Sequence, residues 1–556
     1  MKTNIKGLFL AGLAALVVGC TDLDVDVESQ YTEYPTNEIA LEAKMADIYY
    51  HFSGVLGRRY MEVMCLSSDE YSAASYGGGW YDGGAYAHPA LHNYTFEDAT
   101  IDWFGTITEG ISKANRVIVD LGGNDAGAAV APARAIRAFF HWIIMDGWGD
   151  IPILDRIPDD GETIDRKPRA EVTRWLESEL LAVIPDLTTD VNENTYGKPT
   201  RWMAEALLAK IYINWPVYTA PSVESYDAAA ANNEKLADCI KMCDDIINSG
   251  KFNLGSMSYR EKFSYNNGPK VEDFIYAMPY DTQTRQGMQY GRSRCWKNIK
   301  KMAKSYFGDA LSQSGGGYIT MTPEFVKRTF ILPGDERNKC VIGLSSNPND
   351  YRYVAGQDEN TVFVYNKSNL QMTNEVARVE GPDSDPLKLK VNVTLANAND
   401  PTLDVGDNIN GYCQGCRSVK WYVIDDDFKN GRNQSNDVPL FRFADVLLMK
   451  AEALTRQNGS AEARTLFNKV RAYANAPELD HNPSLEEIYD ERGREFFDEN
   501  WRRNDMIRFG HFEDEYFPHY KNFPTARFEK TCRIFPIHKD ILNLNPSWKQ
   551  NAGYSN

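Results

Sequence analysis

The sequence lacks the features of several large functional classes. Basic residues are not in excess, because 60 Lys and Arg stand against 78 Asp and Glu, which gives a formal net charge of −18. Nucleic-acid phosphates and anionic lipid surfaces both require clustered cations, so this balance argues against either partner being bound through a basic surface. Beyond residue 20 the chain also lacks an apolar run of about 18 residues, so we predict no transmembrane helix.

Motifs of several common enzyme and cofactor classes are missing as well. The sequence contains no HExxH, GxSxG or Walker phosphate-binding motif. Asp425-Asp426-Asp427 places three carboxylates together, but it lacks the ligand spacing and the Gly of an EF-hand, and we interpret it as a solvated turn. We therefore predict no cofactor and no metal site, and leave a structural calcium ion open.

Cysteine is scarce, with 9 in 556 residues. Apart from Cys20, eight remain, an even number that permits disulfides in an exported protein without fixing their connectivity. Cys413-Gln-Gly-Cys416 is the one CxxC, and neither a second pair at metal-ligand spacing nor a thioredoxin-like context accompanies it. We interpret the thiols as structural or locally disulfide-bonded, with metal and redox roles as the less favoured alternatives.

The amino terminus has the pattern of an export signal. Lys2 and Lys6 precede an apolar run over residues 8–18, as in a secretory signal peptide, here residues 1–19. The ending Val17-Val18-Gly19-Cys20 resembles a bacterial lipobox, which would make Cys20 the first mature residue and its site of lipidation. An ordinary cleaved signal with an incidental cysteine is the alternative. Residues 20–40 begin with the acidic stretch TDLDVDVE after Cys20, and we predict a lipidated acidic tether there.

Residues 41–556 are predicted to form a single, mainly α domain. The segment 440–474 indicates two helices joined at Asn458-Gly459, with apolar residues at helical spacing in each. Small residues between them are typical of tetratricopeptide-type helix pairs, which bury their apolar faces against neighbouring pairs. We predict a tetratricopeptide-like helix-pair scaffold in 41–250 and 439–556. The part between, 251–438, is predicted to be an irregular, loop-rich face with a few short strands.

Two patterns outside this hairpin lead to further structural predictions. In the middle part, TVFVY (361–365) and LKLKVNV (387–393) alternate like strand pieces. In the C-terminal part, Ser484-Leu485-Glu486-Glu487 is a capping box that opens a helix. Within that helix a stack of carboxylates resembles an active site, but we interpret it as salt-bridged packing. The predicted pairs are between Glu491, Glu495, Glu499 and Arg494, Arg502, Arg503.

Segments spread over most of the chain resemble one known family. In order they are WFGTITEGISKANRVI (103–118), the Ala-Phe-Phe to Gly-Asp-Ile-Pro run (138–152), Lys167-Pro168-Arg169, the helix after Gly197, FRFADVLLMKAEAL (441–454), ERGREFFDENWRRNDMIRFG (491–510) and the tail from Ile534 to Tyr554. With the lipobox, this ordered set resembles the SusD/RagB family of outer-membrane nutrient-binding lipoproteins of Bacteroidetes. The acidic stretch after Cys20 also resembles the surface-export signals of such lipoproteins.

The resemblance implies a function without catalysis. Members of that family lie on a TonB-dependent, SusC-like transporter, capture glycan or sometimes peptide, and pass it inward. It implies a protein anchored in the outer membrane by acylated Cys20 and facing the cell exterior. Three alternatives stay open: a peptide-binding lipoprotein of the RagB type, a surface glycoside hydrolase, whose paired carboxylates a sequence cannot reveal, and a helical-repeat adaptor that binds only protein.

Candidate ligand-binding residues follow from the chemistry of sugars, whose flat C–H faces stack on exposed aromatic rings and whose hydroxyls need polar partners. Loops on a rigid scaffold are the usual place for such groups. Two stretches, 76–86 and 280–296, fit this description. The candidates are Trp80 and Tyr81 as platforms with Asp82 as a hydroxyl partner, and Tyr290 and Trp296 as platforms with Arg292 as a donor. Trp103, Trp142, Trp148 and Trp202 are predicted to be core residues instead.

Overall fold

The predicted helix hairpin is present at the predicted position. Helix α17 (Phe443–Arg456) and helix α18 (Ala461–Tyr473) are joined at Asn458 and Gly459, whose φ angles are +94° and +72°. The Gly459 N–H donates to the Leu454 carbonyl at 3.0 Å and closes α17. The Ser460 hydroxyl accepts the Ala463 N–H at 3.1 Å and starts α18.

The structure is a computed structural model that describes residues 37–73, 86–294, 312–313, 319–344, 361–365, 372–378, 391–393, 404–406, 414–514 and 525–555. The chain divides into two units, residues 1–46 and residues 47–556; apart from the bounds of α2, the description below concerns the second. The predicted signal peptide, Cys20 and most of the predicted tether lie outside the described residues.

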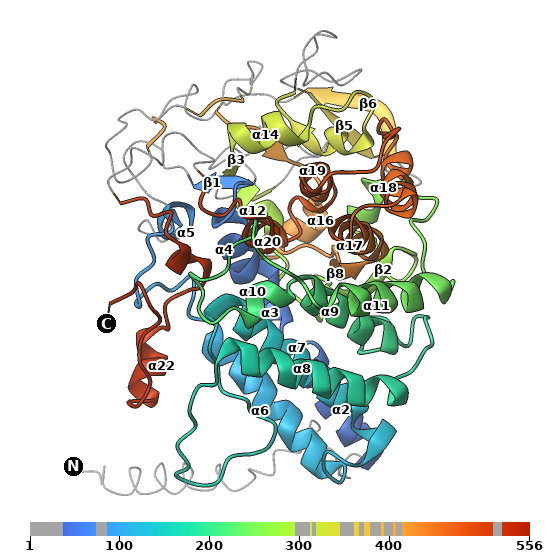
Figure 1. Cartoon of the computed structure of the whole chain (residues 1–556). Helices are drawn as coiled ribbons and strands as arrows, with labels where there is room; N and C mark the ends of the chain where they lie inside the picture. Colours follow the sequence, from blue (N-terminus) through green and yellow to red (C-terminus); the bar gives the residue numbers. More distant parts are fainter. Residues whose placement is uncertain are drawn as a thin grey trace, which may run out of the picture. The chain divides into compact units, whose positions relative to one another are not determined.

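Helices dominate the described residues, which confirms the prediction of a mainly α fold (Figure 1). The longer helices are α2 (Asn37–Tyr49), α6 (Phe104–Asp120), α7 (Ala131–Trp148), α8 (Arg169–Val183), α9 (Arg201–Ile213), α11 (Leu236–Asn248), α17, α18, α19 (Leu485–Phe496) and α20 (Arg502–Phe509). The shorter ones are α3 (Ser53–Val55), α4 (Met61–Leu66), α5 (Ala87–Leu91), α10 (Trp215–Thr219), α12 (Tyr290–Arg294), α14 (Pro323–Thr329), α16 (Asp425–Phe428) and α22 (Lys539–Leu544). A π-helical turn, Leu56–Tyr60, links α3 to α4, and 3-10 turns occupy Gly127–Ala129, Ile184–Asp186, Glu261–Phe263, Glu336–Cys340 and Lys530–Arg533.

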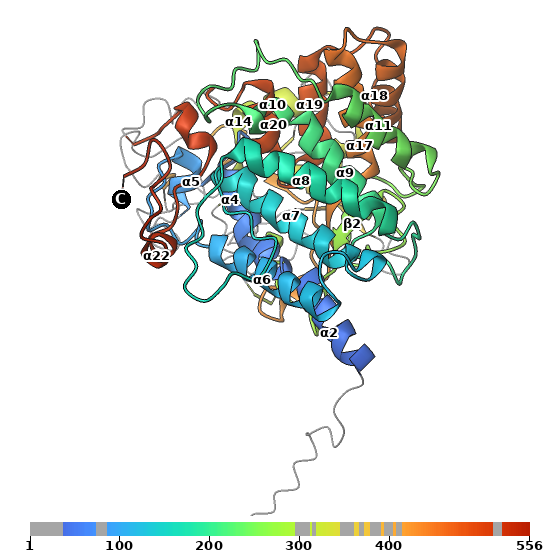
Figure 2. The same ribbon diagram turned by 60° about the horizontal axis from the view of Figure 1, so that its bottom comes forward.

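The long helices pack in series. Helix α6 contacts α7, α7 contacts α8, and α8 contacts α9. The series continues from α9 to α11, from α11 to α17, and from α17 to both α18 and α19. Figures 1 and 2 show α6, α7, α8 and α9 side by side in both views. Each helix therefore buries its apolar face against its neighbours, as predicted for stacked helix pairs.

The helical core contains the tryptophans that the sequence assigns to it. Trp103, Trp142, Trp148 and Trp202 expose 2%, 1%, 0% and 6% of their surface. The Trp103 and Trp148 rings meet edge to face, with centroids 4.5 Å apart. At the start of α9, Thr200 is the N-cap, because its hydroxyl accepts the Met203 N–H at 3.3 Å.

Short two-stranded sheets connect distant parts of the chain. The pairs are β1 (Tyr71–Ala73) with β3 (Ile319–Met321), β2 (Phe274–Met278) with β8 (Val438–Arg442), β4 (Val341–Ile342) with β7 (Arg417–Ser418), and β5 (Thr361–Tyr365) with β6 (Met372–Arg378), all antiparallel. The β2–β8 pairing places Met278 opposite Val438, so the chain returns to the same place after residues 279–437. The TVFVY strand is confirmed as β5. Of LKLKVNV, the described residues 391–393 are not in a strand, and the rest lies outside the described residues.

The predicted ion pairs of the C-terminal helix are only partly correct. Glu491 and Arg494 do pair, at 3.0 Å, but Arg502 pairs with Asp69 at 2.7 Å. Helix α19 ends at Phe496, and Asp498 and Asn500 then take positive φ angles. The helical spacing assumed for Glu499, Arg502 and Arg503 is therefore lost, and buried cations from other elements pair with these carboxylates. Glu495 contacts Arg337 and Arg442, and Glu499 contacts Lys420 and Arg442.

The described cysteines are all buried and form no disulfide: Cys65, Cys239, Cys243, Cys340, Cys416 and Cys532. Cys416 is thus not disulfide-bonded, and Cys413 and Cys295 lie outside the described residues. Within the described ranges, no three His, Cys, Asp or Glu side chains are grouped so as to hold a metal ion. None of the helices in the described part of the chain combines the length and apolar character needed to cross a membrane.

Candidate functional site

Of the six predicted ligand-binding residues, the structure describes two, both on helix α12. Tyr290 is completely buried, its hydroxyl accepts from Asn500 Nδ2 at 3.0 Å, and its ring meets Trp421 edge to face at 5.3 Å. The prediction that Tyr290 exposes its ring is therefore wrong, because side chains distant in the sequence cover it. Arg292 is half-buried, and its guanidinium donates to Gln289 Oε1 at 3.3 Å. Trp80, Tyr81, Asp82 and Trp296 lie outside the described residues.

Described residues close in sequence to the two groups of candidates contact one another. Strand β1 leads into the stretch with Trp80, and α12 leads into the stretch with Trp296. The guanidinium of Arg294, at the end of α12, lies 5.1 Å from the ring centroid of Tyr71, at the start of β1. Ala73 pairs with Ile319, the first residue of β3. The described residues that flank the predicted ligand-binding stretches are therefore neighbours.

Residues 414–418 form a third segment that packs against these residues, through β3. The Met321 N–H donates to the Cys416 carbonyl at 3.0 Å, which ties β3 to the residues that precede β7. Gly415, with a φ of +74°, lies so close to Thr320 that a Cβ there would overlap the Thr320 hydroxyl. We call the described residues of β1, β3, α12 and 414–418 the loop base. It is a tightly packed platform from which several chain segments start.

A buried ion pair connects the loop base to the helical scaffold. Arg294 Nε donates to Asp498 Oδ2 at 2.9 Å, and the two side chains are 2% and 0% exposed. The same Asp498 oxygen accepts the Ser418 hydroxyl at 2.9 Å. Because both charges are out of water, removal of either would leave the other unpaired and costly, so the connection is rigid.

Glu70, directly before β1, also joins the loop base to Asp498. Its Oε1 accepts the Asp498 N–H at 3.3 Å, and its carbonyl accepts the Thr322 N–H at 3.0 Å. Burial, followed by the nearby charge of Asp69, raises the pKa of Glu70 to about 8. Glu70 is therefore mainly protonated at neutral pH and adds no full negative charge to this interior region.

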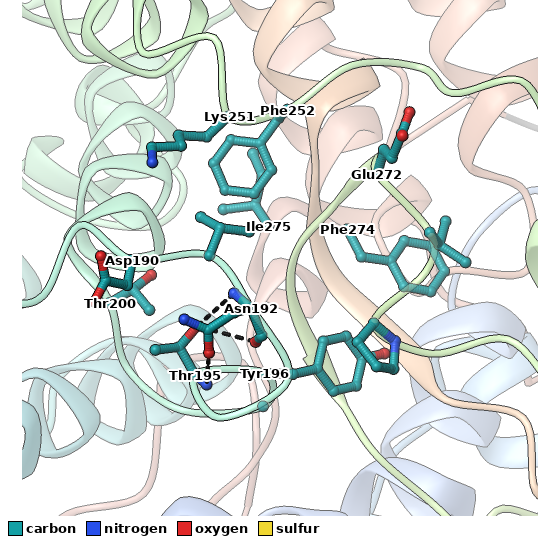
Figure 3. A pocket seen from close by; sticks show the side chains of 14 residues that line it. Asp190, Asn192, Thr195, Tyr196, Thr200, Lys251, Phe252, Glu272, Phe274 and Ile275 are labelled. Atoms are coloured by element: carbon teal, nitrogen blue, oxygen red, sulfur yellow. Dashed lines mark hydrogen bonds between the residues drawn. The ribbon is translucent and has the colours of Figure 1, made fainter.

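A cavity of about 220 Å³ lies away from these residues, against the helical scaffold (Figure 3). It is built by the segment between α8 and α9, by the residues that follow α11, and by those that lead into β2. Its lining residues are Asp190, Val191, Asn192, Thr195, Tyr196, Gly197, Thr200, Lys251, Phe252, Pro269, Val271, Glu272, Phe274 and Ile275. No sequence pattern marks any of these residues as a ligand contact.

The walls of this cavity are held by local hydrogen bonds. Asn192 Oδ1 accepts the Asn194 N–H at 2.8 Å, and the Asn192 N–H donates to Thr195 Oγ1 at 3.0 Å. The Tyr196 hydroxyl donates to Asp437 Oδ2 at 2.9 Å. Asp437 in turn accepts the Tyr280 N–H at 2.7 Å. The side of the cavity formed by 190–197 is therefore preformed and linked to the residues where β8 begins.

Comparison with known proteins identifies one family. A model of the SusD family matches residues 272–554. The starch-binding protein SusD of Bacteroides thetaiotaomicron is 33% identical over 154 residues, which cover 27% of this chain and 28% of that protein. The SusD-like protein P25 of Formosa agariphila is 41% identical over 99 residues, which cover 16% and 19%. The matched stretches thus span less than a third of these curated relatives.

Solved structures extend the similarity over almost the whole chain. The surface glycan-binding protein A of Bacteroides uniformis superposes with a TM-score of 0.65 and 17% identity, covering 93% of this chain and 99% of that one. A laminarin-binding SusD-like protein gives a TM-score of 0.63 and 19% identity, covering 93% and 100%. At these identities the superpositions show a shared fold, and the helix-pair scaffold is common to them.

Proposed function

The chain belongs to the SusD family, and on this basis we propose that it captures a glycan at the cell surface and delivers it to a TonB-dependent, SusC-like transporter. Relatives named as starch-binding and laminarin-binding support a carbohydrate ligand. The proposed ligand is an oligosaccharide or polysaccharide, and the proposed role is binding without cleavage.

The contact between Arg294 and Tyr71 is the observation that carries this proposal furthest. Arg294, two residues before Trp296, lies beside Tyr71, nine residues before Trp80, and this supports a shared location for the two candidate stretches. An oligosaccharide binds through several weak contacts that it must touch at the same time. Separate loops that start from a shared base can provide such contacts close together. We propose Trp80, Tyr81, Asp82, Arg292 and Trp296 as the ligand contacts, with Tyr290 as a supporting core residue.

The proposed membrane arrangement rests on the amino terminus. Lipidation of Cys20 would anchor the protein in the outer membrane, and the acidic segment after it would let the folded domain face outward. Each buried CH₂ of the lipid contributes about 0.8 kcal/mol, so several acyl chains give stable attachment. This arrangement places the domain where an outer-membrane transporter can receive its ligand.

The binding proposal is tested by affinity electrophoresis of the mature domain in gels that contain starch, laminarin or other polysaccharides. We expect retardation by at least one polysaccharide and no release of reducing sugar. Trp80→Ala and Trp296→Ala should each weaken the retardation, because an aromatic contact contributes about 0.5–1.5 kcal/mol beyond burial. Reducing-sugar release that depends on one carboxylate would overturn the proposed binding role.

The control for these variants is Trp548→Ala. Trp548 is a half-buried tryptophan of the C-terminal tail, where its Nε1 donates to the Ile164 carbonyl at 2.8 Å. We expect this change to leave retardation unaltered. If Trp548→Ala weakens binding as much as the two test variants do, loss of an aromatic ring at the proposed site is not the cause.

Delivery is tested separately by purification of the full-length lipoprotein from detergent-solubilised outer membranes. We expect a TonB-dependent transporter to co-purify in a stable ratio. Recovery of the lipoprotein alone, under conditions that preserve its glycan binding, would contradict the delivery role and leave the binding role standing.

A further inference from the structure

We propose that the cavity lined by the connection between α8 and α9, by residues 251–252 and by residues 269–275 is a second carbohydrate site that accepts a single sugar residue. It involves none of the aromatic candidates of the first site. It also lies on the helical scaffold rather than at the loop base. The two sites can therefore be tested independently, and the failure of one does not decide the other.

The cavity combines an apolar floor with a polar rim. Phe252 and Ile275 are only 5% and 8% exposed and form the floor, while Asp190 and Lys251 at the rim are exposed. Figure 3 shows the Phe252 and Ile275 side chains between those of Lys251 and Glu272. Small-ligand sites typically join an apolar surface to a few fixed polar groups in this way.

The rim offers both hydrogen-bond acceptors and hydrogen-bond donors. Among the described residues, neither the Asp190 carboxylate nor the Lys251 ammonium has an ion-pair partner. The Asn192 carbonyl oxygen is occupied by backbone N–H groups, so its side-chain NH₂ is the donor available to a ligand. A sugar hydroxyl donates and accepts at once, which makes it complementary to this mixture.

The charges at the rim favour a neutral ligand. Two carboxylates, Asp190 and Glu272, stand against one ammonium, Lys251, so the surroundings are net negative and disfavour an anion. A simple cation would make no favourable apolar contact with the floor formed by Phe252 and Ile275. A neutral ring with C–H faces and several hydroxyls uses both the floor and the rim.

The size of the cavity limits the occupant to one ring. Its volume of about 220 Å³ corresponds to roughly seven water molecules at about 30 Å³ each. Sites for drug-sized ligands are larger, about 300–1,000 Å³. A terminal residue of a glycan or a free monosaccharide fits this limit, whereas the interior of a polysaccharide chain does not.

The preformed wall lowers the entropic cost of binding. Residues 188–202 are fixed before any ligand arrives, since the Arg201 N–H donates to the Thr188 carbonyl at 3.0 Å and Trp202 Nε1 donates to the Thr189 carbonyl at 3.0 Å. With little to order on binding, a few hydrogen bonds suffice for measurable affinity.

The test uses saturation-transfer NMR and calorimetric titration of the mature domain with D-glucose, D-galactose, D-mannose and D-xylose. We expect at least one of them to bind with a Kd of about 1 mM. Lys251→Met and Asp190→Ala should each weaken that binding about fivefold or more, because each removes a charged hydrogen-bonding group. No saturation transfer from any of the four sugars would overturn the proposal.

Two controls match these variants in residue type and neighbourhood. Lys270→Met and Glu193→Ala change exposed charges next to the cavity that do not line it, and both should leave sugar binding unchanged. Equal losses in test and control variants would overturn the cavity site, because they would indicate a general charge effect.

A Trp80→Ala/Trp296→Ala double variant separates this site from the one under Proposed function. It should lose polysaccharide retardation and keep monosaccharide binding. If monosaccharide binding is lost in the double variant and kept in Lys251→Met, the sugar binds at the aromatic loops and the cavity proposal is wrong. If retardation is absent in the parent protein while the cavity variants still lose sugar binding, the cavity proposal stands alone.

Discussion

Glu491 is a carboxylate enclosed by guanidinium groups inside the protein. Arg337, Arg471 and Arg494 approach it at 2.7, 2.9 and 3.0 Å. Burial alone would raise its pKa, but the three cations, led by Arg337, lower it to about 2. Removal of Glu491 would leave these buried guanidiniums short of a counter-charge, and breaking a buried ion pair in this way costs about 3–5 kcal/mol. Carboxylates that resemble an active site in the sequence are thus structural in the fold.

Asp437 is the opposite case, a buried carboxylate for which no cation compensates burial. Burial raises its pKa to about 6, although the Tyr280 N–H and the Tyr196 hydroxyl favour the ionised form. Arg285 also lowers the pKa, and Asp281 raises it. The native state therefore keeps a proton that the unfolded chain loses above about pH 4. Ionisation of Asp437 consequently makes the free energy of unfolding fall as the pH rises from about 4 to about 6.

We predict that Asp437→Asn stabilises the protein above pH 6. The amide oxygen can still accept the Tyr280 N–H and the amide NH₂ can donate to the Tyr196 hydroxyl, so both contacts survive without a buried charge. The gain should be at most about 3 kcal/mol at about pH 7.5 and should vanish near about pH 4. Urea unfolding of both proteins across this pH range measures it. A difference between variant and parent that does not change with pH would contradict the prediction.

At the scale of single elements, sequence patterns correctly predicted those helix starts and turns that depend on contacts between residues close in the sequence. The Ser484 capping box forms as expected, with the Glu487 N–H donating to Ser484 Oγ at 3.2 Å and Glu487 Oε2 accepting the Ser484 N–H at 2.8 Å. The turn at Asn458-Gly459 is likewise predictable, because Gly takes positive φ at little cost. The end of α19 was not predictable, since Asp498, which follows it with a positive φ, has its buried partner Arg294 more than 200 positions away.

The difference between local and distant contacts also explains which features of the candidate sites could be predicted from the sequence. Tyr290 is covered by Asn500 and Trp421, which sequence spacing could not place beside it. The cavity is assembled from three segments around Asn192, Lys251 and Phe274, and none of them carries a motif. The aromatic, Gly-rich composition near Trp80 was readable from the sequence, but the shared base of the two loops required the structure.

The loop base yields a prediction at the scale of one strand connection. Gly415→Ala places a Cβ against the Thr320 hydroxyl and strains a backbone with φ of +74°. We expect it to displace 414–418 from β3 and to weaken polysaccharide retardation, while circular dichroism still shows the helical scaffold. Combination with Thr320→Gly should restore part of the retardation, because it removes the clash.

Gly250→Ala is the matched control for this substitution. Gly250 has a similar φ of +65°, but no atom lies within 4 Å of a Cβ placed there. It should cost only backbone strain, about 1–2 kcal/mol, and leave glycan binding intact. Unaltered retardation in Gly415→Ala, measured on folded protein, would show that the loop base does not position the ligand contacts.

At the scale of the whole molecule, the helices of the scaffold form one continuous stack although they are not consecutive in the sequence. Helices α11 and α17 pack together although residues 249–442 separate them, and β2 and β8 close the gap. The intervening segment also supplies Arg337 and Lys420 as buried partners of Glu495 and Glu499, so only its parts away from such contacts can vary without disturbing the stacked helices. This arrangement suits a receptor in which a rigid frame holds variable ligand-contacting loops.

The lipid anchor determines where this receptor can act. A single acyl chain gives only marginal membrane binding, so a lipoprotein held by several chains on Cys20 should depend on that residue. We predict that Cys20→Ser shifts the full-length protein from the outer-membrane fraction to the soluble fraction. Ser29→Ala, a change in the same tether that leaves the thiol in place, should remain membrane-bound and accessible to added protease on whole cells. Retention of Cys20→Ser in membranes after an alkaline wash would contradict lipidation at this position.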